Sequence, residues 1–162
     1  MPLEHPDNQH LNAAQGFAAL GMYQEGNAEL EQIDPFCRAL PEVLQVRLEI
    51  YRGASQWELM QQVAKKLAEY DRNEPQWVVS WAYATRRAES VEAANKLLTD
   101  AVKRFPEEPI IEYNLGCYAC QLEDLETARE HLKRAFTLQP KCREMALADD
   151  DLEPLWKSLA VP

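Results

Sequence analysis

The chain has 162 residues, with 17 basic and 27 acidic side chains, a formal net charge of −10 and a hydrophobic fraction of 46%. This length fits a single domain, and this hydrophobic fraction indicates a folded chain rather than a disordered one. The excess of negative charge repels phosphate backbones and anionic lipids, so we expect neither nucleic acid nor a membrane as a partner.

The sequence pattern predicts neither a signal peptide nor a membrane-spanning helix. The first residues, MPLEHPDNQH, carry neither a basic n-region nor an apolar h-region, so we expect no signal peptide. The apolar runs are only a few residues long, which predicts no membrane-spanning helix. Cys37, Cys117, Cys120 and Cys142 are irregularly spaced, which favours reduced thiols and a cytoplasmic location over a disulfide framework.

Prolines recur along the chain at a spacing of 34 residues. Pro41, Pro75 and Pro109 form one series, and Pro106 and Pro140 form a second. Proline is favoured in the first turn of a helix, where its missing N–H has no helical partner to lose. The spacing therefore predicts a helical unit that is repeated along the chain.

Apolar and small residues recur at the same spacing, in five columns. Within each unit they lie three or four residues apart, as on one face of an α-helix. The columns are Leu20, Ala54, Ala88 and Leu122; Tyr23, Trp57, Val91 and Leu125; Gly26, Met60, Ala94 and Ala128; Leu30, Ala64, Leu98 and Leu132; and Ile33, Leu67, Ala101 and Ala135.

These spacings predict one domain over residues 1–162 that contains four helix-turn-helix units, near residues 7–40, 41–74, 75–108 and 109–142. The expected first helices are 9–20, 41–52, 75–87 and 109–121. The expected second helices are 23–33, 56–70, 90–104 and 124–137. Ser55, Ser90 and Asp124 stand just before second helices and are predicted N-caps.

Residues 143–162 follow the last unit and are predicted to cap it. We expect a helix over 141–148 with Met145 and Leu147 facing inward, and then a second amphipathic helix. Asp149–Asp151 precedes that helix and suits its positive N-terminal end. We expect its apolar stripe to cover the fourth unit, and the alternative that it is offered to another protein stays open. The stripe is Leu152, Leu155, Trp156 and Leu159.

The repeat resembles the tetratricopeptide repeat (TPR) family, and the resemblance covers nearly the whole chain. It is best in the fourth unit, although three positions that are usually aromatic there carry Glu112, Ala119 and Leu132. The ending DDDLEPLW also resembles the tail of bacterial TPR proteins. The small and apolar positions that carry the resemblance are Leu115, Gly116, Ala128, Leu132, Ala135 and Pro140.

The resemblance implies an all-α fold, an α-α superhelix or TPR solenoid of about four helix-turn-helix repeats with a C-terminal capping helix. It also implies that the first helices line a concave groove, which holds an extended peptide or a helix of a partner protein. The groove positions transferred in this way are Asn12, Gln15, Gln45, Glu49, Arg52, Val79, Tyr83, Arg86, Arg87, Tyr113, Asn114, Cys117 and Gln121, with Leu11, Val46 and Ser80 beside them.

A basic and aromatic cluster within these positions gives the most specific expectation about the partner. Tyr83, Arg86 and Arg87 lie three and four residues apart on one helix, with Arg52 one repeat earlier. Arginine can bind a carboxylate through two nitrogens, so we expect an acidic or mixed-polarity peptide as partner. The alternative is that these arginines pair with glutamates of neighbouring helices. Those glutamates are Glu49, Glu89 and Glu92.

The sequence therefore predicts a non-catalytic protein-interaction scaffold, or adaptor, without a cofactor. Cys117 and Cys120 form a CxxC pattern, which keeps a metal- or thiol-dependent factor as an alternative. No second CxxC accompanies it, and its place inside a predicted helix favours packing. No phosphate-binding, nucleophile-elbow or dinucleotide-binding motif is present. A self-assembling TPR module is a further alternative, and the oligomeric state stays open.

Overall fold

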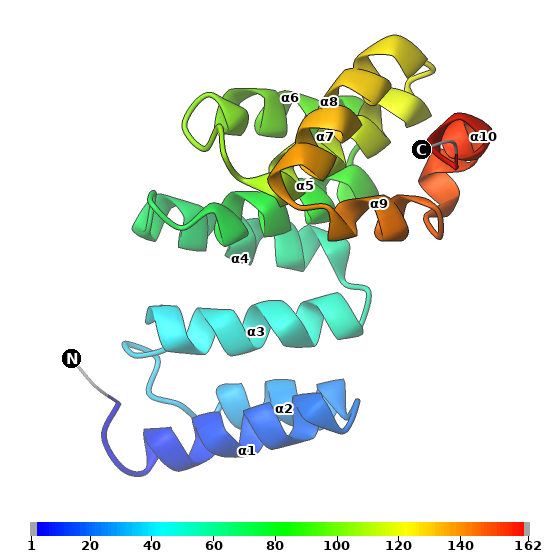
Figure 1. Ribbon diagram of the computed structural model, residues 1–162. Coiled ribbons are helices and arrows are strands. Elements are labelled where there is room, and N and C mark those ends of the chain that lie inside the picture. The colour runs from blue at the N-terminus through cyan, green and yellow to red at the C-terminus, as the bar shows by residue number, and fades with distance from the viewer. Residues whose placement is uncertain (1–2, 161–162) are drawn as a thin grey trace. The chain divides into compact units, whose positions relative to one another are not determined.

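The computed structural model describes residues 3–160, and every regular element in that range is a helix (Figure 1). The first eight helices form four consecutive pairs, as the sequence predicts, and their ends fall within a few residues of the expected ones. None of the helices in 3–160 combines the length and the apolarity needed to cross a bilayer. The pairs are α1 (Asp7–Ala19) with α2 (Tyr23–Leu30), α3 (Pro41–Gly53) with α4 (Trp57–Tyr70), α5 (Pro75–Ala88) with α6 (Val91–Val102), and α7 (Pro109–Gln121) with α8 (Leu125–Leu138).

The helices divide between two compact units. The first unit ends at Asn73 and contains α1 to α4, and the second begins at Glu74 and contains the remaining helices. That the whole chain is one domain stays a prediction, and residues 1–2 and 161–162 of that predicted domain lie outside the described part.

Two of the three predicted N-caps are confirmed. The side chains of Ser90 and Asp124 each accept a hydrogen bond, at 3.1 Å, from the backbone N–H three residues further on. The prediction for Ser55 is wrong, because the residue that precedes α4 is Gln56, whose side chain makes no capping bond. Gln56, Ser90 and Asp124 are 34 residues apart, so the repeat itself places the cap one residue after Ser55.

The turns within the pairs repeat a backbone conformation as well as a length. Gly21, Ser55 and Glu123 occupy the same position of three turns and have φ angles of +74°, +55° and +64°. Only glycine enters this left-handed region without steric cost, so the two other residues adopt it because the turn requires it. The backbone conformation of the turn is therefore repeated, although the three residues at this position have chemically different side chains.

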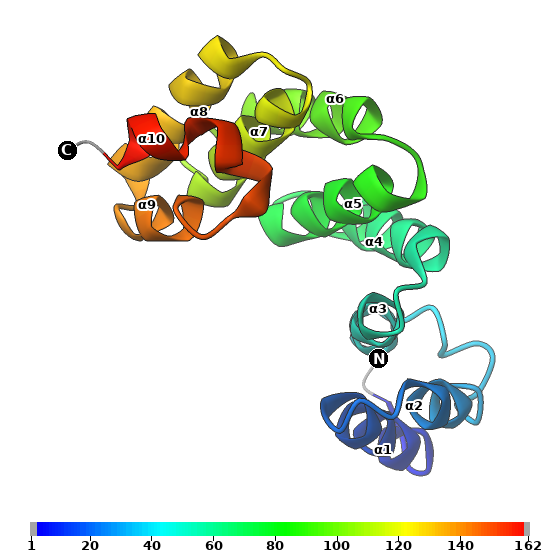
Figure 2. The ribbon, with the colours of Figure 1, turned by 90° about the vertical axis from the view of Figure 1, so that its right-hand side faces the viewer.

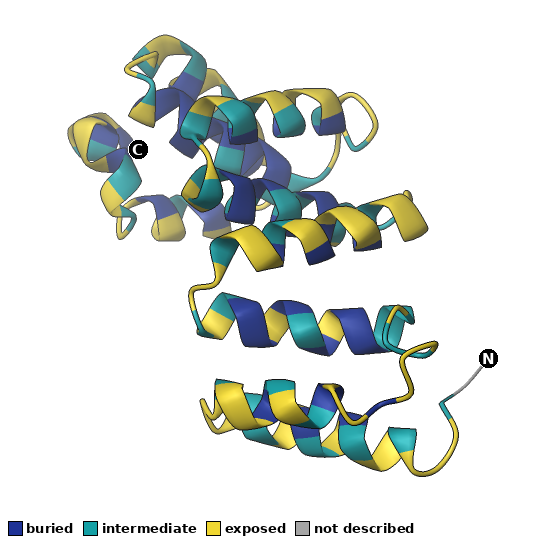
Figure 3. Ribbon diagram, turned by 180° about the vertical axis from the view of Figure 1, so that it is seen from behind, coloured by how far each residue is buried: buried dark blue, intermediate teal, exposed yellow. Residues whose placement is uncertain are grey.

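Three of the five predicted columns form the core of the helix pairs. Every member of the columns that begin at Gly26, Leu30 and Ile33 is buried. Figure 3 shows buried positions in dark blue along the helices. The column that begins at Tyr23 is half-buried throughout. The prediction fails for Leu20, which is 74% exposed because it follows the last residue of α1 and lies in the turn.

Small residues allow α7 and α8 to approach closely. A Cβ atom placed on Gly116 would lie 2.7 Å from Cγ of Leu132 and 3.3 Å from the carbonyl oxygen of Ala128. Ala128 itself is fully buried. Any larger side chain at these positions would force the two helices apart.

The C-terminal segment covers the fourth pair, as predicted, but in shorter elements. A 3₁₀-helix, η1 (Asp150–Leu155), packs against α7 and is followed by α10 (Trp156–Leu159), which contacts η1 and α9 (Lys141–Ala146) (Figure 2). Leu152 and Leu155 are fully buried in the same core as the residues of α7. Pro154 lies within η1 and lacks the N–H that a longer regular helix would use.

The helix between α8 and η1 faces the core with other residues than predicted. This helix, α9 (Lys141–Ala146), buries Cys142 and Ala146. The prediction that Met145 and Leu147 point inward is wrong, since their exposures are 43% and 42%. Cys142 and Ala146 are one turn apart and define the buried face, so Met145 falls off that face and Leu147 follows the end of the helix.

Candidate functional site

The first unit contains an open cleft between α1 and α3, with a volume of about 590 Å³. Four residues that the sequence predicts for a partner groove, Gln15, Gln45, Glu49 and Arg52, lie together in its lining, and Val46 lies beside them. Asn12 is also exposed on α1 but does not line the cleft. The lining residues are Gln15, Ala18, Ala19, Tyr23, Glu42, Gln45, Val46, Glu49, Arg52 and Gly53.

One wall of the cleft depends on a glycine. A Cβ atom on Gly53 would lie 2.1 Å from Cζ of Tyr23, so glycine lets this ring lie directly against the end of α3. On the other side, Ala18 and Ala19 present small side chains at the end of α1. The cleft is therefore apolar at this end and open because its residues are small.

The charged residues of the cleft lie on α3 and are predominantly acidic. Glu42 and Glu49 stand against one basic residue, Arg52. The Arg52 Nη1 atom lies 3.5 Å from Oε1 of Glu49, and both side chains are more than a third exposed, so water screens this pair strongly. The lining carries a net charge of −1 and offers acidic side chains to an approaching ligand.

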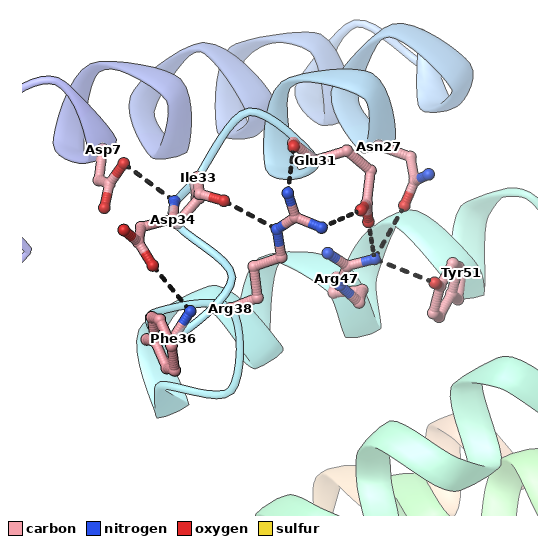
Figure 4. A network of polar contacts seen from close by, with 9 residues as sticks. All are labelled: Asp7, Asn27, Glu31, Ile33, Asp34, Phe36, Arg38, Arg47 and Tyr51. Carbon is pink, nitrogen blue, oxygen red and sulfur yellow. Dashed lines mark hydrogen bonds and ion pairs between the residues drawn. The ribbon is translucent and has the colours of Figure 1, made fainter.

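The opposite side of α3 is fixed by a polar network with α2 (Figure 4). Arg47 Nη1 donates to Oε1 of Glu31 at 2.8 Å, and also to the side-chain oxygens of Asn27 and Tyr51 at 3.3 Å. Arg38 donates to the same Glu31 carboxylate at 2.7 Å from the connection that joins α2 to α3. These charge-assisted bonds hold α3 on α2.

The second unit uses its groove residues to hold its own C-terminal segment. Arg86 donates from both terminal nitrogens to the two carboxylate oxygens of Asp151, with 2.8 Å between Nη2 and Oδ1. Tyr113 donates its hydroxyl to Oδ2 of Asp149 at 2.8 Å, and Gln121 donates from Nε2 to the backbone oxygen of Asp151 at 2.9 Å. Three predicted groove residues therefore bind a segment that follows them in the chain.

Electrostatics in this contact favour a charged Asp151 and neutral neighbours. The hydrogen bond from Arg86 holds the pKa of Asp151 below its ordinary value. Burial raises the pKa of Tyr113 and of the Cys117 thiol, and their interactions with Asp149 act in the same direction. Both groups stay protonated near neutral pH and can donate to the Asp149 carboxylate, whose Oδ2 lies 3.6 Å from the Cys117 sulfur.

The remaining predicted groove residues of the second unit lie around this contact. The Arg87 guanidinium lies over the Tyr83 ring, 3.6 Å from its centroid, and Nη1 of Arg87 donates to the Tyr83 backbone oxygen. Val79 and Asn114 are half-buried on α5 and α7. A shallow cleft of about 580 Å³ is bounded by both arginines and by the segment that Arg86 holds. Its lining residues are Arg86, Arg87, Tyr113, Met145, Ala148, Asp149, Asp150 and Asp151.

The open cleft of the first unit and the occupied surface of the second unit are equivalent in the repeat. Each residue that lines the open cleft has a counterpart two repeats later, and four of these counterparts hydrogen-bond to Asp149 or Asp151 of the C-terminal segment. The first unit therefore leaves open the place that the second unit fills with its own chain. The equivalent pairs are Ala18 and Arg86, Gln45 and Tyr113, Glu49 and Cys117, and Gly53 and Gln121.

A buried hydrogen bond between α7 and α8 was missed by sequence reasoning. Glu112 is 3% exposed, and its Oε2 atom lies 2.6 Å from Nδ1 of His131. Arg134 approaches the other carboxylate oxygen at 3.5 Å. The available signal was the carboxylate at a position that is usually aromatic and buried in the repeat, because a buried carboxylate requires a donor nearby.

The cysteines that suggested thiol or metal chemistry are packed into the core. Cys117 and Cys120 are buried in α7, and neither is in a disulfide. Burial raises the pKa of both thiols, which disfavours the thiolate that nucleophilic or metal-binding cysteine requires. Within residues 3–160, no three His, Cys, Asp or Glu side chains are grouped so that they could hold a metal ion.

Comparison with solved structures identifies the architecture. A structure of MamA (residues 41 to the end) from Desulfovibrio magneticus RS-1 matches with a TM-score of 0.73 at 18% identity, over 98% of this chain and 92% of that one. A double mutant of MamA RS-1 matches with a TM-score of 0.74 at 17% identity, over 86% and 78%. The fold is of the tetratricopeptide type.

A third structure, of MamA MSR-1, matches with a TM-score of 0.66 at 16% identity, over 97% of this chain and 96% of that one. At these sequence identities the similarity shows the TPR-type fold, and it does not indicate a specific binding site or partner for this chain. No protein-family model and no curated protein sequence matches the chain.

Proposed function

We propose that this protein is a non-catalytic scaffold that binds a segment of a partner protein in the cleft between α1 and α3. The proposal rests on the surface that Arg86, Tyr113 and Gln121 form in the second unit. This surface binds a segment of the same chain, through Asp149 and Asp151. The cleft is the equivalent place in the first unit, and it is open. A TPR-type pair of repeats can bind a peptide there without any change in its backbone.

The observations give less support to the other functions. A thiol- or metal-dependent factor would need accessible thiolates, whereas Cys117 and Cys120 are buried and their pKa values are raised. An acidic partner at Arg86 remains a prediction, and it would have to displace Asp151, which already takes both of its terminal nitrogens. The open cleft is the better binding surface because nothing in the described residues has to leave it.

Blocking the cleft tests the proposal. Ala19 is exposed at the end of α1 and lines the cleft, so Ala19→Trp should obstruct it without disturbing the core. The matched control is Ala28→Trp, at an exposed position of α2 that does not line the cleft. The partner would be isolated by affinity capture and its dissociation constant measured by calorimetry against the purified variants.

We expect Ala19→Trp to weaken binding by roughly tenfold or more, since such a loss corresponds to about 1.4 kcal/mol. The control should change affinity less than about twofold, as surface substitutions away from a site do. Equal affinities for both variants would place the partner elsewhere and refute the proposal.

A further inference from the structure

The two equivalent surfaces differ in charge, although they share the geometry of the repeat. In the second unit, Arg86 and Arg87 provide two positive charges where the acidic segment lies. In the first unit, the equivalent residues are Ala18 and Ala19, which carry none. The first unit therefore lacks the groups that would hold an acidic segment.

Acidic residues take the place of apolar and neutral ones on the other helix. Glu42 and Glu49 line the cleft on α3, and their counterparts two repeats later are Ile110 and Cys117. Arg52 offsets part of this charge through its pair with Glu49 at 3.5 Å. Glu42 lies two helical turns before Glu49 and adds a second carboxylate to the same side of α3. The ten residues that line the open cleft carry a net charge of −1, whereas their ten counterparts in the second unit include Arg86 and Arg87 as the charged residues and carry +2, so the sign differs between the equivalent positions.

We propose that the partner segment is basic: it places lysine or arginine side chains beside Glu42 and Glu49, and small apolar side chains on Ala18, Ala19 and Val46. This inference rests on the proposed function and names the partner class for the same cleft. The net charge of −10 acts in the same direction, because it attracts a basic segment and raises its association rate.

The same charges disfavour a second copy of this chain's C-terminal segment as the occupant. Asp149, Asp150 and Asp151 would bring three carboxylates to a cleft that already carries two. Like charges brought together at an interface cost binding free energy, and no equivalent of Arg86 is present to compensate. The cleft therefore discriminates against the segment that the second unit accepts.

Selection from a peptide library tests this inference and requires no purified partner protein. Short randomised peptides displayed on phage are selected on the wild-type protein, and those that also bind the Ala19→Trp variant are removed. The peptides that remain are specific for the cleft. Their affinities are then measured by fluorescence anisotropy, at low and at raised salt, for synthetic versions of the most frequent sequences.

We expect the cleft-specific peptides to contain more Lys and Arg than Asp and Glu, and their affinity to fall as salt is raised. The double variant Glu42→Lys/Glu49→Lys should lose roughly tenfold or more in affinity, and Glu42→Gln/Glu49→Gln, which keeps the side-chain shape, should lose less. Glu58→Lys/Glu69→Lys is the matched control, since it makes the same charge change at exposed positions of α4 and should alter affinity less than about twofold.

The outcomes separate the two proposals. Cleft-specific peptides that are mainly acidic, or that bind both double lysine variants equally, would overturn the basic partner class and leave the cleft as a binding site. If no peptide distinguishes the wild-type protein from Ala19→Trp, the cleft binds no peptide and the proposed function fails together with the inference. Circular dichroism of each variant checks that the helices are intact.

Discussion

Arg86 on α5 binds the carboxylate of Asp151, 65 residues further along the chain, through both of its terminal guanidinium nitrogens. This contact joins the third repeat to the segment that caps the fourth. It also occupies both terminal nitrogens of Arg86, which would otherwise attract an acidic partner. The second unit thus contains a bound peptide of its own, and the first unit contains the open equivalent.

Removing the Asp151 charge should destabilise the second unit. A hydrogen bond to a charged group contributes about 1.5–3 kcal/mol, and since both side chains are partly exposed we expect Asp151→Asn to cost about 1–2 kcal/mol at pH 7. Urea denaturation followed by circular dichroism measures the change. Asp150→Asn, at an exposed neighbour, is the control and should have little effect.

The same pair predicts a dependence of stability on pH. The pKa of Asp151 in the folded state lies below its unfolded value of about 3.9, so its contribution is complete above that value and is lost as pH falls through the folded-state pKa. The stability difference between the wild-type protein and Asp151→Asn should therefore shrink as pH falls below about 4. A difference that stays constant down to pH values near 3 would contradict this account.

Overpacking the contact between α7 and α8 should destabilise the protein. Ala128 is fully buried where α8 meets Gly116, so Ala128→Leu has no space for three additional carbon atoms. We expect a loss of about 1–3 kcal/mol, measured by denaturant unfolding. Lys133→Leu, on the exposed side of the same helix, should change stability by no more than about 0.5 kcal/mol. Equal effects at the two positions would mean that the repeat register is incorrect.

Gly53 and Tyr23 should behave as a coupled pair. Alanine at position 53 favours the helix by up to about 1 kcal/mol, but its Cβ atom would overlap the Tyr23 ring. In a double-mutant cycle, Gly53→Ala should be less favourable in the wild-type background than in the Tyr23→Ala background. Identical effects in both backgrounds would show that the ring does not depend on the glycine.

His131 should matter more for stability than Arg134, although both face the same carboxylate. His131 lies 2.6 Å from the buried Glu112, and its removal would leave the carboxylate poorly satisfied, at a cost of about 1–3 kcal/mol. Arg134 is 53% exposed and lies 3.5 Å away, so Arg134→Ala should cost less than about 1 kcal/mol. Thermal unfolding of His131→Ala and Arg134→Ala measures the two losses of stability. A larger loss for Arg134→Ala would contradict this assignment.

The fold could be predicted from the sequence because its determinants are local and repeated. Pro41, Pro75 and Pro109 each begin a helix, and the N-caps Ser90 and Asp124 are confirmed by their hydrogen bonds. The buried columns follow from helical spacing alone. Where the expectation failed, as at Leu20 and Ser55, the residue lies in a turn, where a shift of one position changes its surroundings completely.

The contacts of the candidate sites could not be predicted, because they join residues that are distant in the sequence. The pattern that placed Arg86 and Tyr113 on the groove gave no reason for Asp149 and Asp151 to reach them, since that depends on how the 3₁₀-helix η1 lies on α7. The predicted groove residues Tyr113 and Cys117 are accordingly buried. The first cleft is likewise open because no later segment among the described residues covers it. The residues that line the cleft give no indication of this in the sequence.

Photo-crosslinking from Gln45 tests the central claim most directly. Gln45 is exposed and lies in the lining of the cleft on α3. A photoreactive amino acid at this position should crosslink the partner through one short segment that contains more basic than acidic residues, identified by mass spectrometry. The same amino acid in place of Glu69, at an exposed position of α4, should give no such crosslink. Crosslinks of equal yield from both positions, or from position 69 alone, would contradict the assignment of the cleft as the binding site.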